Sequence, residues 1–168
     1  MTAFLAADRS VAVDLDDQAI ESMRALCVKS ARLETGGVVI GRYNEFGDRV
    51  VVSKVSGPPR DSRRSAFSFI RGVAGLTNRL RVDWRDGLYY VGEWHFHPFA
   101  APKPSGTDLK QIKAFARTAD LRCSRPVIVI LGGNPADRWS LRVAIVTDGA
   151  VMDLEQVPAE ADVRVAVG

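Results

Sequence analysis

The sequence has few residues suited to transition-metal binding or covalent cross-linking: among its 168 residues are two cysteines and two histidines. Cys27 and Cys123 stand far apart and in no Cys-x-x-Cys spacing, which excludes a disulfide framework and a thiolate metal site. We therefore expect both cysteines to be reduced residues of the core.

Long hydrophobic runs are also lacking. No segment approaches the roughly 18 uninterrupted apolar residues of a membrane span, and the N-terminal MTAFLAADRS has no basic start followed by a sustained apolar run. The sequence therefore predicts no membrane partner, and a cytoplasmic location is the simplest expectation.

Strong charge of one sign is lacking too. The net charge is +3, and no lysine-rich or aromatic-interleaved stripe indicates a nucleic-acid partner. A hydrophobic content of 46% and a charged content of 26% are ordinary for a globular protein. We expect residues 1–168 to form one domain, with a motif-bearing core at about 12–148. In residues 150–168 the pattern indicates no more than a possible last strand.

Hydrophobic periodicity predicts interleaved helices and strands without a regular βαβ order. This favours an α/β domain of the α+β kind, built on one mixed sheet, over a doubly wound fold. The expected helices are 14–31, about 71–84 and 107–120, and the expected strands are 36–43, 49–57, 88–96, 125–133 and 138–149, the first two as a hairpin.

Both histidines fall in one stretch, GEWHFHPFAAPKPSGTD, from Gly92 to Asp108. In an extended strand, His95 and His97 point to the same face, about 7 Å apart. Ser105 and Asp108 stand at the start of the next helix, where the helix dipole favours a carboxylate. Two imidazoles and one carboxylate leave the fourth position of a tetrahedral zinc open for water, as in hydrolytic zinc sites.

Each part of this pattern also has a simpler interpretation. Ser-x-x-Asp before an apolar helix is a capping box, and His-x-His is often two surface residues of a strand. The capping and metal interpretations overlap, because Ser105 can cap the helix while Asp108 binds a metal. Trp94 and Phe96 face away from the histidines and are most simply core.

The spacing of His95-Phe-His97, then Pro98 to Pro104, then Ser105-Gly-Thr-Asp108 resembles the HxHP and SxxD signature of the JAMM (MPN-plus, JAB1/MPN) zinc metallopeptidases. The segment from Glu34 to Gly41 is similar to the family's upstream catalytic glutamate and glycine pair. The wider chain, over roughly residues 34–133, is similar to the bacterial members grouped as Prok-JAB. The resemblance implies an MPN/JAB-like domain, a curved mixed sheet flanked by helices with cytidine-deaminase-like layering.

The resemblance also implies the roles of individual residues. His95, His97 and Asp108 would hold one Zn²⁺ per chain, Glu34 would act as general base, and Ser105 would stabilise the oxyanion. Glu93 shares the face of the histidines, so spacing alone makes it an equally good base or ligand, or a partner that orients an imidazole.

Two other groups could contact substrate. Gly36 and Gly37 could allow a substrate backbone to approach closely, although a turn at the start of a strand explains them as well. Arg63 and Arg64, with Arg60 and Arg71, could clamp an acidic partner, although such a charge run is usually a solvated face.

The resemblance implies a deubiquitinase-like isopeptidase that cleaves after the extended C-terminal tail of a ubiquitin-like or conjugated bacterial protein. Such proteins are often encoded in ubiquitin-like or CBASS antiphage operons. Alternatives are a peptidase that processes a sulfur-carrier precursor, a non-catalytic MPN scaffold, and a non-haem iron oxygenase or cupin. The sequence indicates no oligomeric state.

Overall fold

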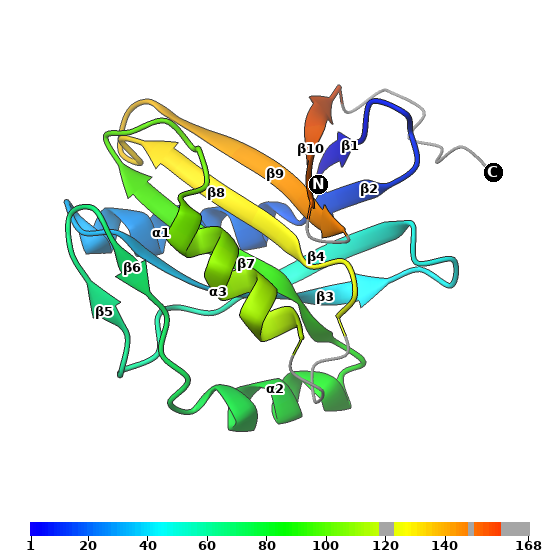
Figure 1. The fold of residues 1–168 in the computed structure, drawn as a ribbon, viewed down its shortest axis with the longest axis horizontal. Helices are drawn as coiled ribbons and strands as arrows, with labels where there is room; N and C mark the ends of the chain where they lie inside the picture. The colour runs from blue at the N-terminus through cyan, green and yellow to red at the C-terminus, as the bar shows by residue number, and fades with distance from the viewer. Residues whose placement is uncertain (118–122, 148–149, 159–168) are drawn as a thin grey trace.

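The computed structural model describes residues 1–117, 123–147 and 150–158, and in it a mixed sheet curves until it closes into a barrel (Figure 1). Around the barrel the order is β1 (Thr2–Leu5), β10 (Ala150–Val157), β9 (Trp139–Thr147), β8 (Val127–Gly133), β7 (Tyr89–Pro98), β3 (Thr35–Tyr43), β4 (Arg49–Val55) and β2 (Ala12–Leu15). The pairs β2–β4 and β7–β8 are parallel, and the other pairs are antiparallel. A separate hairpin consists of β5 (Arg63–Arg64) and β6 (Phe69–Ile70).

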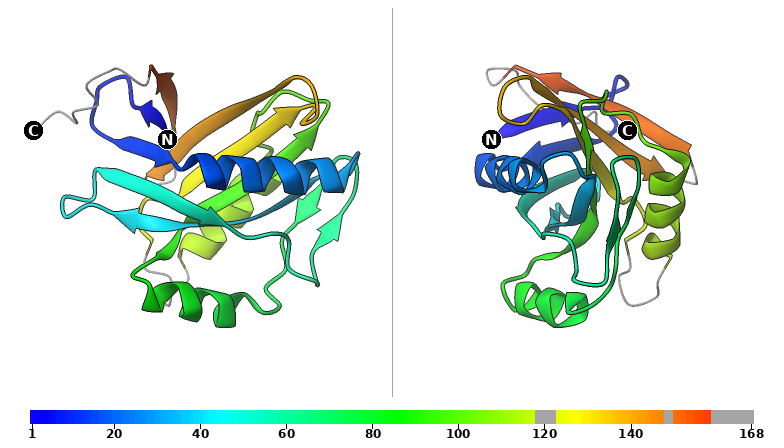
Figure 2. Two further views of the ribbon diagram at one scale, coloured as in Figure 1. Left: turned by 180° about the vertical axis from the view of Figure 1, so that it is seen from behind. Right: turned by 90° about the vertical axis from the view of Figure 1, so that its left-hand side faces the viewer.

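Helices cover both faces of the sheet, and the views in Figure 2 place α1 (Asp17–Ser30) and α3 (Gly106–Ala116) on opposite sides. Along β8, Val127, Val129 and Leu131 join the core that contains the buried residues of α1. Ile128 and Ile130 instead pack with Ile112 of α3. This alternation is expected of a strand buried on both faces, and it separates the molecule into two apolar layers.

The strand β7 lies between these layers and positions the site. Trp94 and Phe96 are fully buried in the α1-side core, as the sequence predicts. The indole Nε1–H of Trp94 donates a 2.8 Å hydrogen bond to the carbonyl of Ser56 and so ties β7 to the end of β4. The intervening residues of β7 must therefore face α3.

The expected fold class is confirmed, and most expected elements are present. The predicted hairpin appears as β3 and β4, and the strands β7, β8, β9 and β10 lie where the sequence places them. The first helix starts at Asp17 rather than at residue 14, because Asp16 caps it and accepts a 2.8 Å hydrogen bond from the N–H of Gln18. Residues 118–120, 148–149 and 159–168, parts of the expected last helix and strands, lie outside the described residues.

The second helix, α2 (Leu76–Arg85), is shorter than the predicted 71–84 at its start. The apolar spacing from Phe69 onward suggests one helix, but Phe69 belongs to β6 and the helix is preceded by Gly75 in a left-handed conformation, with φ of 78°. The pattern predicts neither β1, β2, β5 nor β6, since strands of two to four residues carry almost no periodic signal.

Both cysteines lie in the core, as the sequence predicts. Cys27 and Cys123 are both free and buried, and burial raises the pKa of Cys123 to about 11. Among the described residues, no helix is long and apolar enough to cross a membrane.

Candidate metal centre

Three polar side chains of β7 lie buried on the face toward α3. Glu93, His95 and His97 have exposed fractions of 0%, 1% and 7%, values that are rare for such residues unless they have partners. The prediction that these three side chains share one face of the strand is confirmed. A carboxylate oxygen of Glu93 lies 3.6 Å from Nε2 of His95, and both histidines approach the carboxylate of Asp108.

The start of α3 brings Asp108 onto the same face. Ser105 and Asp108 form a reciprocal cap: the Ser105 N–H donates to Asp108 Oδ2 at 2.6 Å, and the Asp108 N–H donates to Ser105 Oγ at 3.1 Å. The same carboxylate approaches both histidines, with Oδ1 3.0 Å from His95 Nδ1 and Oδ2 3.3 Å from His97 Nε2. The capping box and the candidate metal site are therefore one structure.

Glu34 stands at the edge of this cluster, immediately before β3. In the antiparallel pairing of β3 with β7, Thr35 is opposite Phe96 and Gly36 is opposite His95, so Glu34 continues the register to the level of His97. The side chain is half-buried, and its main chain is held by a 2.8 Å hydrogen bond from its N–H to the carbonyl of Ser65. Burial raises the pKa of Glu34; His97 and His95 oppose this rise, and Asp108 adds to it.

The glycine pair after Glu34 is explained by packing within the chain. A Cβ on Gly36 would lie 2.3 Å from the carbonyl oxygen of Trp94 and 2.7 Å from the ring of Phe69. A Cβ on Gly37 would lie 2.3 Å from the carbonyl oxygen of Ser56. Only glycine fits at either position, and a role in substrate binding stays a prediction.

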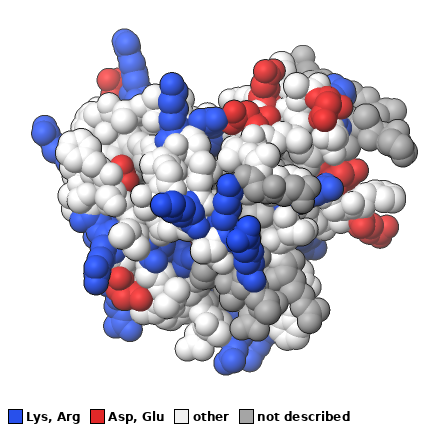
Figure 3. Space-filling view, in the orientation of Figure 1, with Lys and Arg blue, Asp and Glu red and all other residues white. Residues whose placement is uncertain are grey.

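The four arginines of the predicted clamp separate into two groups. Arg60, Arg63 and Arg64 are exposed, whereas the side chain of Arg71 is only 4% exposed and donates a 3.0 Å hydrogen bond to Glu93. Placing Arg71 in a solvated charge run was therefore wrong, because the chain turns inward at β6 and the buried Glu93 binds its guanidinium. Basic side chains outnumber acidic ones on the face that carries α3 (Figure 3).

Two residues that sequence reasoning missed support the cluster, Phe69 by direct contact and Gln111 through the main chain of residues 69–71. The ring of Phe69 packs edge-on against His95, with ring centroids 5.4 Å apart, and the side chain of Gln111 bridges the main chain of β6 to α3. Neither has a sequence signal of its own, because both act through contacts between segments distant in the chain.

The electrostatics of the cluster favour a cation. Burial would lower the pKa of His95, but the carboxylates of Asp108 and Glu93 outweigh it and raise the pKa to about 9. Burial would raise the pKa of both carboxyl groups, but the histidines, together with Arg71 beside Glu93, hold both pKa values below their usual range. A bound metal requires neutral imidazoles, and Glu34, Glu93 and Asp108 against Arg71 then give a formal charge of −2, which a divalent cation would balance.

The residue types and their spacing fit a bound metal ion. Both ring nitrogens of His95, Nε2 of His97 and Oε2 of Glu93 are buried without a hydrogen bond of good geometry, despite their short contacts. The 3.0 and 3.3 Å separations of His95 and His97 from Asp108 are close to the roughly 3.3 Å between ligands of a tetrahedral zinc with 2.0–2.1 Å bonds. In the described part of the chain, however, no group of three or more His, Cys, Asp and Glu side chains is already arranged to hold a metal.

Sequence comparison relates this chain to known proteins. Residues 16–143 match the family model described as prokaryotic homologs of the JAB domain. The chain is 41% identical over 131 residues to a CD-NTase/cGAS isopeptidase of Enterobacter hormaechei subsp. hoffmannii, covering 78% of this chain and 73% of that protein. It is 30% identical over 129 residues to the probable metalloprotease y4qB of Sinorhizobium fredii, covering 74% and 77%.

A solved structure supports the fold alone. The solution structure of protein DSY2949 from Desulfitobacterium hafniense superposes with a TM-score of 0.64 at 19% sequence identity. The similarity covers 85% of this chain and 90% of that one.

Proposed function

Because this chain belongs to the prokaryotic homologs of the JAB domain, we propose that it hydrolyses an isopeptide bond of a conjugated bacterial protein with the help of a bound zinc ion. It is an isopeptidase of the metallopeptidase class. The observation that carries the proposal is the convergence of His95, His97 and Asp108 in a buried cluster, with the half-buried Glu34 at its edge. A scaffold that only binds partners would have no need of buried donors without good hydrogen bonds.

The proposed roles follow from the positions of the residues. His95, His97 and Asp108 would hold one Zn²⁺ per chain, which, when bound, lowers the pKa of a coordinated water toward neutrality. Glu34 would accept a proton on its carboxylate and pass it to the leaving amine, a role that its raised pKa suits. Ser105 would donate its hydroxyl hydrogen to the developing oxyanion while its oxygen keeps capping α3. Residues 1–168 would form one peptidase domain.

The substrate is inferred from the names of relatives. Relatives at 41%, 24% and 29% identity carry the name CD-NTase/cGAS isopeptidase. We take the substrate to be a CD-NTase/cGAS-type protein, or a ubiquitin-like protein, that is joined to a target. Its extended C-terminal tail would precede the scissile bond. The setting would be an antiphage or ubiquitin-like conjugation system. An extended tail can lie beside a strand and present its backbone to the site.

The test is cleavage of a fusion in which a CD-NTase/cGAS-type protein precedes the scissile amide. We expect cleavage after the tail, lost with a zinc chelator and restored by added zinc. Glu34→Gln should retain zinc and lower turnover by about 10²- to 10⁴-fold, because it removes the base but no ligand. Glu45→Gln, an exposed glutamate of the β3–β4 turn, is the matched control and should cleave like the parent protein.

The same assay tests how substrate is recognised. A short peptide of the tail alone should be cleaved far more slowly than the folded fusion, because it lacks the remote binding energy that orients the bond. Equal rates would identify a general peptidase instead. An active Glu34→Gln variant together with an inactive Glu93→Gln variant, each measured with saturating zinc, would transfer the role of the base to Glu93.

A further inference from the structure

A chain of buried contacts links the β6 segment to His95. Nη2 of Arg71 donates to Oε1 of Glu93 at 3.0 Å, and the second oxygen of Glu93 lies 3.6 Å from Nε2 of His95. The opposite ring nitrogen of His95 faces Asp108 at 3.0 Å. His95 therefore lies between two carboxylates, with one nitrogen toward each, and Arg71 binds the carboxylate on the Glu93 side.

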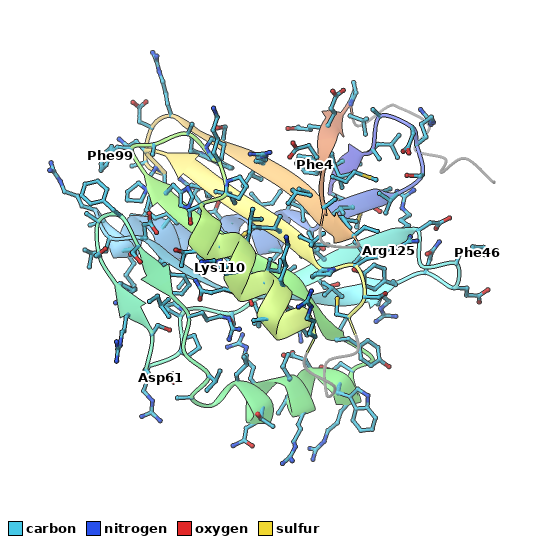
Figure 4. All side chains as sticks on the ribbon, viewed as in Figure 1. Phe4, Phe46, Asp61, Phe99, Lys110 and Arg125 are labelled. Carbon is cyan, nitrogen blue, oxygen red and sulfur yellow. The ribbon has the colours of Figure 1, made fainter. Side chains whose placement is uncertain are left out.

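The segment that carries Arg71 is fixed at several points. Gln111 of α3 accepts a 2.8 Å hydrogen bond from the Arg71 N–H and donates one of 2.8 Å to the carbonyl of Phe69. Asp61, in the loop before β5 (Figure 4), accepts hydrogen bonds of 3.0 and 2.9 Å from the N–H groups of Val73 and Ala74. The backbone around Arg71 is thus held against the same helix that carries Asp108.

Phe69 contacts His95 directly, whereas Arg71 reaches it only through Glu93. Phe69 packs the edge of its ring against the imidazole and limits its rotation, and Arg71 acts through Glu93. The carboxylate–histidine–metal arrangement, in which a carboxylate binds the nitrogen that does not bind the metal, orients the ring and makes it a stronger ligand. Glu93 stands where such a carboxylate is needed, and a small side-chain movement would close its 3.6 Å separation from His95 to a hydrogen bond.

We propose that Arg71 is a positioning residue of the metal centre: it holds Glu93 beside one nitrogen of His95, so that the other nitrogen is presented to the metal together with Asp108. The proposal rests on the zinc site proposed above. A guanidinium suits the task because it carries a permanent charge and binds a carboxylate oxygen in a fixed direction, which a lysine ammonium does not. Without Arg71, Glu93 would remain a buried carboxylate with no cation to fix its orientation.

The experiment measures zinc affinity by competition with a chromogenic chelator, on the full chain. Arg71→Met and Glu93→Met should each weaken zinc binding by about 10- to 100-fold, the usual effect of losing a residue that orients a metal ligand. Because Arg71 acts through Glu93, the double variant should be no weaker than Glu93→Met alone. Arg71→Lys should lie between Arg71→Met and the parent. Arg63→Met, which removes an exposed arginine of the adjoining hairpin, is the matched control and should bind like the parent.

A second readout separates positioning from a loss of fold. The visible absorption of the Co²⁺-loaded protein should change in Arg71→Met and stay unchanged in Arg63→Met, since it reports the ligand geometry. If Arg71→Met does not fold, Arg71→Lys replaces it, because lysine keeps a cation beside the buried Glu93 but lacks the fixed donor geometry of a guanidinium.

The outcomes distinguish this inference from the proposed function. A parent protein that binds no zinc would overturn the metal site itself. A parent that binds zinc, with affinity and Co²⁺ spectrum unchanged in Arg71→Met, or in Arg71→Lys if Arg71→Met does not fold, would overturn only the role of Arg71. Losses that multiply in the double variant would show that Arg71 does not act through Glu93.

Discussion

Two buried carboxylates of this protein bind an arginine, and they do so differently. Asp14 of β2, 3% exposed, uses both oxygens for Arg49 of β4: Nε donates to Oδ2 at 2.6 Å and Nη2 donates to Oδ1 at 3.0 Å. Glu93 of β7, fully buried, uses Oε1 for Arg71, while Oε2 has no hydrogen bond and faces His95.

The difference separates a structural carboxylate from a functional one. A bidentate arginine saturates Asp14 and ties β2 to β4 where these strands run parallel. Burying a carboxylate with one oxygen that accepts no hydrogen bond costs free energy of folding, unless that oxygen interacts with another group. At Glu93 that group is the imidazole of His95, so the incomplete pairing falls in the region where we propose that the chemistry takes place.

The largest expected effect comes from removing the imidazole itself. His95→Ala and His97→Ala should each lose bound zinc and essentially all cleavage. Only two protein ligands would remain in each variant, and the chain has no third histidine to replace the lost one. Metal content after dialysis and the fusion assay measure this. Tyr89→Ala, an exposed change on the same strand, should behave like the parent. Near-stoichiometric zinc in either histidine variant would contradict the proposed metal site. Glu93 would then have no functional role that sets it apart from Asp14.

A moderate effect is expected at the structural pair. Asp14→Asn should lower the free energy of unfolding by about 1–3 kcal/mol, because Arg49 keeps a buried neutral partner in place of a charged one. Denaturant unfolding measures this loss. Zinc affinity should be unchanged, the reverse of the pattern expected for Arg71→Met. A comparable loss of zinc in Asp14→Asn would show that the two regions are not independent.

The smallest effect is expected at an ion pair on the surface. Arg142 of β9 donates two hydrogen bonds to Asp153 of β10, from Nε to Oδ1 at 2.6 Å and from Nη2 to Oδ2 at 2.7 Å. The Asp153 side chain is nevertheless 56% exposed. Asp153→Asn should therefore change the free energy of unfolding by only about 0.5 kcal/mol or less. The loss should shrink further at high salt, unlike the loss at Asp14. A loss as large as that of Asp14→Asn would contradict burial as the basis of the comparison.

Sequence reasoning reached those parts of the site that lie close together in the chain. The two-residue period of a strand placed Glu93 and both histidines on one face, and the Ser-x-x-Asp spacing placed Asp108 at a helix start. These predictions succeeded because strand parity and helix capping are local rules. The function of Glu34 came only from family resemblance, although the register of β3 against β7 now places it level with His97.

Hydrophobic periodicity and charge runs did not predict contacts between segments that are distant in the chain. Arg71 reads as one more arginine of a charged loop, and Phe69 reads as the first apolar position of a helix, yet both turn inward at β6 and contact the cluster. The glycine pair looks like a turn, whereas its real constraint is the approach of Trp94, Phe69 and Ser56.

The sequence by itself determined the proposed ligand set, because its two histidines share one strand face and a capping carboxylate follows within reach of a short loop. Only the tertiary structure decided which side chains surround these residues. Closing the sheet and folding β6 against α3 buries Glu93 beside Arg71. The physical reason is that periodicity records which way a side chain points, whereas burial and charge partners depend on which distant segment packs against it.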